Sequence, residues 1–195
     1  MKEMLSNQSV RSWLLGNVRM TKSQENEWGR ALVASYRPKN SKASAWSGIL
    51  GEQLIREVYP DGWSPKKLGG FKPDWETKDA VIEVKTQSWF TPGTAGEKIF
   101  GVPVKYRNLP ALYNKPLVIV CFGRAESIWF DMKRDESLVR IIDFWKSMNI
   151  TYQRCSELIP PESAPQGFSS ELLDELQFLG RLETHSSPVE REHYS

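Results

Sequence analysis

Histidine is scarce in this sequence, and its placement excludes several kinds of active site. The chain of 195 residues has two histidines, His185 and His193, and both lie in the polar segment at its end. Histidine-based zinc sites, HNH-type nuclease sites and Ser-His triads all need an imidazole inside the folded part of a protein. Any metal site here is therefore expected to consist of oxygen ligands.

Cysteine and long apolar runs are limited as well. Cys121 and Cys155 are the two cysteines, and no CxxC pair occurs, which indicates an intracellular, reducing compartment. No segment approaches the roughly 20 apolar residues of a membrane span, and no secretory leader is recognisable. Walker-type and GxGxxG loops are absent, which excludes nucleotide-driven motors. We therefore expect a soluble protein of the cytoplasm or of a host-cell interior, without a membrane partner.

Charge is nearly balanced over the whole chain, with a formal net charge of +2. The molecule is no polycation, so binding to nucleic acid would require a local basic surface. Basic residues are concentrated around an acidic motif at residues 72–87, whereas acidic residues gather in the last third. These basic residues are Lys39, Lys42, Lys66, Lys67, Lys98, Lys105 and Arg107.

Residues 72–87 read KPDWETKDAVIEVKTQ and end in a predicted strand over 81–87. Side chains alternate along a strand, so Glu83, Lys85 and Gln87 share one of its faces. Two ionisable groups and an amide therefore point in the same direction.

A short turn at Lys78-Asp79 is expected to fold residues 71–77 back beside this strand as a hairpin. The hairpin would bring the Asp74 carboxylate to the Glu83 carboxylate. Two adjacent carboxylates beside the Lys85 ammonium suit a hard divalent cation.

The combination of Asp74, Glu83 and Lys85 resembles the catalytic core of the PD-(D/E)xK nuclease superfamily. The resemblance implies a Mg²⁺-dependent endonuclease in which Mn²⁺ substitutes for Mg²⁺. It implies that Asp74 and Glu83 hold the metal ion with the Val84 carbonyl, and that Lys85 orients the attacking water. The implied reaction is site-specific hydrolysis of duplex DNA, as in type II restriction-type endonucleases of bacteria and large DNA viruses.

Two further residues match positions that the superfamily uses. Glu52 lies at the margin of the apolar stripe of a helix predicted over 45–59, and the resemblance implies that it faces the metal site. The alternative is a boundary glutamate paired with Arg56 at i+4. Gln87 would position the attacking water, and an ordinary glutamine at a sheet edge is the alternative.

The segment 91–107 combines glycines with basic and aromatic residues and is the predicted substrate contact. Glycine lets backbone amides approach a phosphate closely. Tyr106 could stack on a base or sugar, and an ordinary surface loop is the alternative. The other candidate substrate-binding residues are Lys98, Lys105, Arg107 and Asn108.

We predict one α/β domain over 1–182 and a polar, disordered tail over 183–195. The core of this domain is expected to be restriction-endonuclease-like, with a central mixed sheet of four or more strands flanked by helices. No clear final strand follows the last core helix. The predicted elements are an N-terminal helical part (10–36), helix 45–59 with Ser44 as possible N-cap, hairpin strands 71–77 and 80–87, strands 117–122 and 127–131, and helices 136–148 and 169–179.

Cutting both strands of a duplex with one site per chain requires two chains, so the resemblance implies a homodimer. Most of the eight tryptophans are expected in the core rather than at the dimer interface. Four alternatives stay open: a structure-specific repair nuclease, an RNA endonuclease, an inactive nucleic-acid-binding module, and a protein without nuclease activity.

Overall fold

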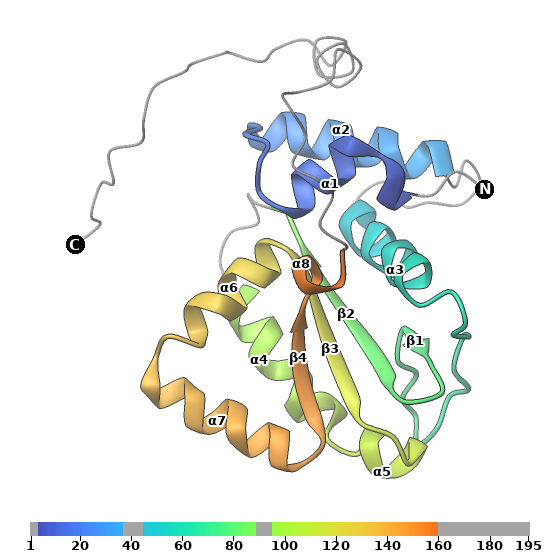
Figure 1. Cartoon of the computed structure of the whole chain (residues 1–195), viewed down its shortest axis with the longest axis vertical. Coiled ribbons are helices and arrows are strands. Elements are labelled where there is room, and N and C mark those ends of the chain that lie inside the picture. Colours follow the sequence, from blue (N-terminus) through green and yellow to red (C-terminus); the bar gives the residue numbers. More distant parts are fainter. Residues whose placement is uncertain (1–3, 37–44, 89–94, 160–195) are drawn as a thin grey trace. The chain divides into compact units, whose positions relative to one another are not determined.

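The protein folds around a four-stranded mixed sheet with the strand order β1-β2-β3-β4, and helices flank the sheet (Figure 1). The computed structural model describes residues 4–36, 45–88 and 95–159. The mixed sheet and its flanking helices confirm the predicted α/β class. The strands are β1 (Trp75–Glu76), β2 (Val81–Gln87), β3 (Leu117–Gly123) and β4 (Ile150–Arg154).

Strand direction determines how the chain connects the sheet. β1 and β2 form an antiparallel hairpin, whereas β2, β3 and β4 are parallel and are therefore joined by helical crossovers. In the described ranges, no helix combines the length and apolar character that crossing a bilayer demands. The helices are η1 (Met4–Ser6), α1 (Gln8–Leu14), α2 (Lys22–Tyr36), α3 (Trp46–Val58), α4 (Ala95–Tyr106), α5 (Leu109–Tyr113), α6 (Arg124–Met132), α7 (Glu136–Ser147) and α8 (Cys155–Leu158).

The two faces of β2 are covered by different helices. Val81 belongs to a buried cluster with residues of α4, α5 and α6, so this face of the sheet is covered by those helices. The opposite face meets α3 at Gly51, where an added Cβ would lie 1.9 Å from Thr86 Oγ1 and 2.7 Å from Val84 Cγ1. Glu83 and Lys85 therefore project to the side of α4, as the alternation predicted.

The N-terminal helices pack on α3 through three tryptophans. The ring centroids of Trp13, Trp28 and Trp46 lie 5.6 to 5.9 Å apart, and all three side chains are buried. The Trp13 indole donates a hydrogen bond of 2.8 Å to the buried Glu25. With Trp129 also buried, the prediction that tryptophan mainly serves the core is confirmed for these four residues.

Several predicted elements are confirmed with small changes in their bounds. The hairpin forms, although its first strand is limited to β1, and β3, α3 and α7 match the strand and helices predicted at 117–122, 45–59 and 136–148. The N-terminal helical part divides into α1 and α2, because the chain turns at Gly16 with φ of 70°. Ser44, helix 169–179 and the tail lie outside the described residues.

The strand predicted at 127–131 is wrong, because this segment belongs to α6. Gly123 ends β3 with φ of 59°, a conformation that favours glycine, and it precedes the first turn of the helix. Ala125 and Trp129 are both buried and are four residues apart, which is helical spacing.

The final strand that the sequence did not reveal exists as β4. It pairs with β3 in parallel from Ile150 to Arg154, and Ile150 is its one fully buried residue. The following four side chains are half-buried. A strand with so little apolar alternation gives a weak sequence signal.

Candidate metal centre

Asp74 is fixed at the place where the hairpin ladder ends. Its N–H donates to the Ile82 carbonyl at 3.0 Å, but the preceding Pro73 has no N–H and cannot continue the ladder. The Val84 N–H instead donates to Asp74 Oδ2 at 2.7 Å. The carboxylate thus takes the position of a backbone acceptor and is aimed at β2.

Glu83 and Lys85 form a close ion pair on the face of β2 that meets α4. Glu83 is 4% exposed, and Lys85 Nζ lies 2.6 Å from its Oε1. The same ammonium donates to the Val84 carbonyl at 3.1 Å. Two of the oxygens predicted to hold a metal ion therefore already hold a cation.

Burial and nearby charges act on the pKa of Asp74 in opposite directions. Burial raises the pKa of Asp74, while the Val84 N–H and the charges of Lys85, Lys105 and Arg56 oppose that rise. Three cations thus act on this carboxylate from β2, α4 and α3. Sequence reasoning had not placed Arg56 or Lys105 beside Asp74.

The pKa of Glu83 is also raised. Burial raises the pKa of Glu83, the Asp74 charge raises it further, and Lys85 and the Tyr106 hydroxyl act against this. Burial and the Glu83 charge also raise the pKa of Tyr106 to about 12, so its hydroxyl stays protonated near neutral pH. A carboxylate whose pKa is raised both by burial and by the charge of a neighbouring carboxylate is a functional-site signal.

The donor set suits a hard divalent cation. Glu83 Oε2 is buried without a hydrogen-bond partner, which is costly for a carboxylate unless a cation approaches it. The Lys85 ammonium marks a position where Glu83 and the Val84 carbonyl accept positive charge. Among the described residues, no group of three or more His, Cys, Asp or Glu side chains gathers. Two carboxylates and a carbonyl would thus be the protein ligands, as expected for Mg²⁺ that keeps several waters.

Glu52 does not join this group. It lies on α3 with its side chain 42% exposed, and its Oε2 is 3.7 Å from Arg56, which is the alternative named for it. The Arg56 guanidinium lies 5.4 Å from the centre of the Trp75 ring and faces the hairpin. From α3, it is therefore Arg56 whose charge reaches Asp74, and a metal-binding role for Glu52 receives no support here. Gln87 is 9% exposed at the end of β2, and its role remains a prediction.

The predicted substrate segment is largely helical. Residues 95–106 form α4, so the amides of Gly96 and Gly101 belong to a helix and are not those of an open loop. Tyr106 is 7% exposed, which corrects the expectation that its ring stacks on a base. Residues 91–94 lie outside the described residues. Four predicted contact residues are exposed on α4 and just beyond it: Lys98, Lys105, Arg107 and Asn108.

No protein-family model matches the chain, and no curated protein or solved structure is significantly similar to it. The chemistry of the centre is consequently inferred from Asp74, Glu83, the Val84 carbonyl and Lys85. These groups converge from two adjacent strands, and α4 supplies the neighbouring Tyr106 and Lys105.

Proposed function

We propose that the protein is a Mg²⁺-dependent endonuclease that hydrolyses phosphodiester bonds of duplex DNA, built on a restriction-endonuclease-like core. The observation that carries this proposal is the convergence of the half-buried Asp74, the buried Glu83, a backbone carbonyl and an ammonium at β2. Mg²⁺ with these oxygen ligands would supply Lewis-acid activation of the phosphate and an acidified water.

The carboxylates have distinct tasks in this proposal. Asp74 is oriented by the Val84 N–H through Oδ2, which leaves Oδ1 outside that contact. Glu83 offers the buried Oε2, and the nearby Tyr106 hydroxyl opposes the rise in the pKa of this carboxyl. Both side chains are therefore preorganised to bind a cation without a large rearrangement.

Lys85 is the residue that acts on the substrate. Its ammonium is held by Glu83 Oε1 and the Val84 carbonyl, two oxygens that would also hold Mg²⁺. With the ion bound there, the ammonium would be free to orient the attacking water and to offset negative charge on the phosphate in the transition state.

The proposal is tested by incubating the protein with unmodified duplex DNA and Mg²⁺ and mapping any new ends. We expect cleavage with Mg²⁺ or Mn²⁺ and none in EDTA, and loss of cleavage with retained DNA binding in Asp74→Asn and Lys85→Met. Unchanged cleavage in both variants would assign the activity to another site or to a contaminant.

A substrate panel separates the alternatives. Cleavage of branched DNA or RNA in preference to linear duplex would identify a structure-specific or RNA endonuclease using the same centre. Binding without cleavage of any nucleic acid would identify an inactive module. A duplex cut in both strands is expected from two copies of the chain, each contributing one centre.

A further inference from the structure

A tight lysine-rich turn precedes Asp74. Leu68 and Phe71 exchange two backbone hydrogen bonds of 2.9 Å across the pair Gly69-Gly70. These glycines have φ of 57° and 85°, the positive values that a two-residue type I′ turn requires at both central positions. The turn is flanked by Lys66, Lys67 and Lys72, all exposed. It is therefore a defined structure and not a loose loop.

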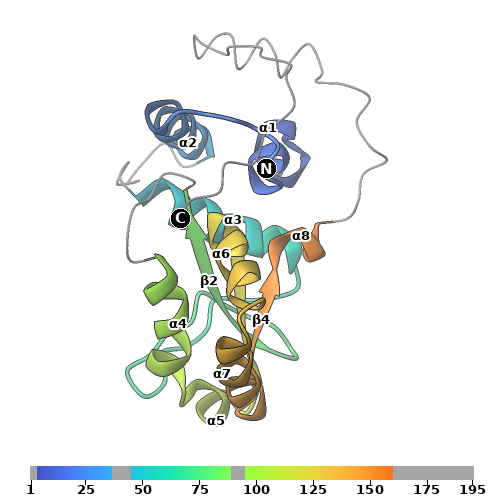
Figure 2. The ribbon, with the colours of Figure 1, turned by 90° about the vertical axis from the view of Figure 1, so that its left-hand side faces the viewer.

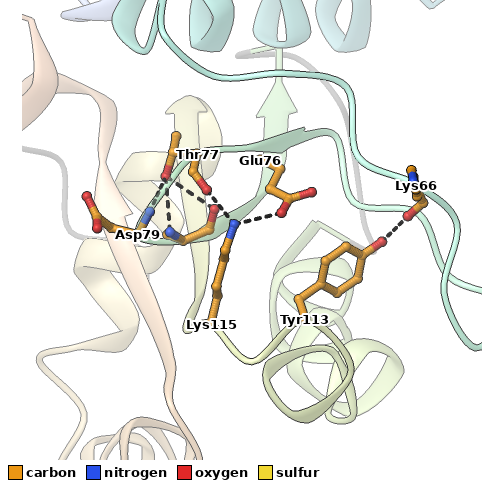
Figure 3. Close-up of polar contacts among 7 residues, drawn as sticks. Lys66, Glu76, Thr77, Asp79, Tyr113 and Lys115 are labelled. Atoms are coloured by element: carbon orange, nitrogen blue, oxygen red, sulfur yellow. Dashed lines mark hydrogen bonds and ion pairs between the residues drawn. The ribbon is translucent and has the colours of Figure 1, made fainter.

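Three contacts hold this turn beside α4 and α5 (Figure 2). The Tyr113 hydroxyl donates to the Lys66 carbonyl (Figure 3). An added Cβ on Gly69 would lie 2.8 Å from Leu112 Cδ1, so backbone and side chain are in close contact. The Phe71 ring meets the Tyr106 ring at 5.8 Å, and Tyr106 borders the candidate metal centre.

The neighbouring hairpin is fixed to the same region. Lys115, between α5 and β3, donates to Glu76 Oε1 at 2.7 Å and to the Thr77 carbonyl at 2.8 Å (Figure 3). Its charge is thereby compensated within the protein. Lys66 and Lys67 of the turn have no acidic residue within four positions in sequence, and Lys72 precedes Asp74 by two residues.

The charged residues in the two sequence segments that meet at this turn are all of one sign. Residues 62–73 and 98–115 contain no acidic residue, although the whole chain has a net charge of only +2. By contrast, exposed α7 mixes Glu136 and Asp143 with Arg140 and Lys146. Six exposed cations of the two segments make up what we call the basic strip: Lys66, Lys67, Lys72, Lys98, Lys105 and Arg107.

We propose that the basic strip binds the phosphate backbone of duplex DNA, with the Gly69-Gly70 turn as its point of closest approach. This inference rests on the proposed function. Exposed lysines neutralise phosphates irrespective of sequence, and Gly70 has open space around the position of an absent Cβ. A backbone contact fits better than base stacking, because the Phe71 and Tyr106 rings pack against each other. The bound duplex is led toward Asp74, two residues after Lys72.

The test measures binding separately from cleavage. Fluorescence anisotropy with a duplex oligonucleotide in EDTA, over a series of salt concentrations, compares the wild type with the triple variant Lys66→Gln, Lys67→Gln, Lys72→Gln. We expect at least tenfold weaker binding, and a slope of log K against log salt that is smaller by about 2 to 3, since each lost phosphate contact removes about 0.9.

A control variant with the same loss of charge is Lys133→Gln, Arg140→Gln, Lys146→Gln, on and beside α7 and outside the two segments of the strip. It should keep the wild-type salt slope. If the turn variant also keeps that slope while the wild type binds duplex, the basic strip is wrong and the endonuclease proposal survives. If the wild type binds no nucleic acid either in EDTA or with a divalent cation present, the proposed function itself is wrong. Tighter binding of single strands that depends on the exposed Trp63 would overturn the duplex assignment.

Discussion

Asp74 combines a structural and an electrostatic task in one side chain. Its Oδ2 satisfies the Val84 N–H, and its charge raises the pKa of Glu83. A substitution can therefore remove the charge while the hydrogen bond stays, or remove both. The two outcomes separate folding from chemistry.

We expect Asp74→Asn to keep the fold, because the amide oxygen still accepts the Val84 N–H, and to lower cleavage by about 100-fold or more through loss of a charged metal ligand. Asp74→Ala should lose activity as well and should also cost about 1 to 3 kcal/mol, because the N–H is left without an acceptor. Urea unfolding and a cleavage assay measure the two effects. Equal stability of both variants would contradict the structural role.

Lys85 should compete with a divalent cation for Glu83 and the Val84 carbonyl. Repulsion between a single and a double positive charge about 4 Å apart amounts to about 2 kcal/mol even in water. Lys85→Met is therefore expected to bind Mn²⁺ about tenfold more tightly than the wild type while it is inactive in cleavage. Isothermal titration calorimetry decides this. Weaker Mn²⁺ binding by the variant would show that the ammonium supports the site in another way.

The raised pKa values of Asp74 and Glu83 imply a pH dependence with a definite sign. Folded-state pKa values above the ordinary carboxyl value of about 4 mean that the folded protein binds these protons more tightly than the unfolded chain. The resulting stabilisation is complete below that ordinary value and is lost as the pH rises through the raised pKa. Relative to the double variant Asp74→Asn, Glu83→Gln, the melting temperature of the metal-free wild type should fall as the pH rises from about 4 toward neutral. A difference that is constant with pH, or that grows, would contradict the shifts.

At the scale of elements, the contact between α3 and β2 sets the position of the centre. Gly51→Ala would place a methyl group 1.9 Å from Thr86 Oγ1, so α3 or β2 must move. We expect a loss of about 1 to 3 kcal/mol in the free energy of unfolding, together with lower activity, because Val84 and Lys85 shift with the strand. Gly48→Ala on the same helix is the matched control, since nothing lies within 4 Å of the added methyl group. It should be neutral or stabilising by up to about 1 kcal/mol, and chemical denaturation checks both.

Elements with strong periodicity could be predicted from the sequence, and those shaped by tertiary contacts could not. β3 is a continuous apolar run and α7 has a wide apolar face, so both were evident. β4 was missed because one apolar residue anchors it, and α4 was missed because Gly101 and Pro103 weaken its helical pattern.

The candidate centre also has a part that the sequence pattern predicts and a part that tertiary contacts determine. Asp74, Glu83 and Lys85 lie within twelve residues of sequence, so strand alternation and one turn were enough to place them together. Arg56, Lys105 and the buried position of Tyr106 depend on how α3 and α4 pack on the sheet. A single sequence does not encode those distances in a readable pattern. Glu52, chosen for its place on the helix and for the resemblance, lies 3.7 Å from Arg56, which is the alternative named for it.

At the scale of the whole molecule, a chain of net charge +2 combines a local concentration of cations with the carboxylates of the half-buried Asp74 and the buried Glu83. The basic strip would attract a polyanion, and the carboxylates would repel it until a divalent cation reverses the local charge. Binding of the metal ion and approach of the phosphate should therefore favour each other. Every part of the proposal depends on that ion binding between Asp74 and Glu83.

The most direct measurement is anomalous scattering from crystals grown with Mn²⁺. We predict one peak at about 2.0 to 2.5 Å from an oxygen of Asp74, of Glu83 and of the Val84 carbonyl, distances usual for hard cations with oxygen ligands. Lys85 Nζ should no longer lie 2.6 Å from Glu83 Oε1, as it does in the structure described above. A saturating Mn²⁺ concentration that gives no peak there, with the Lys85–Glu83 pair intact, would contradict the metal centre and the endonuclease with it.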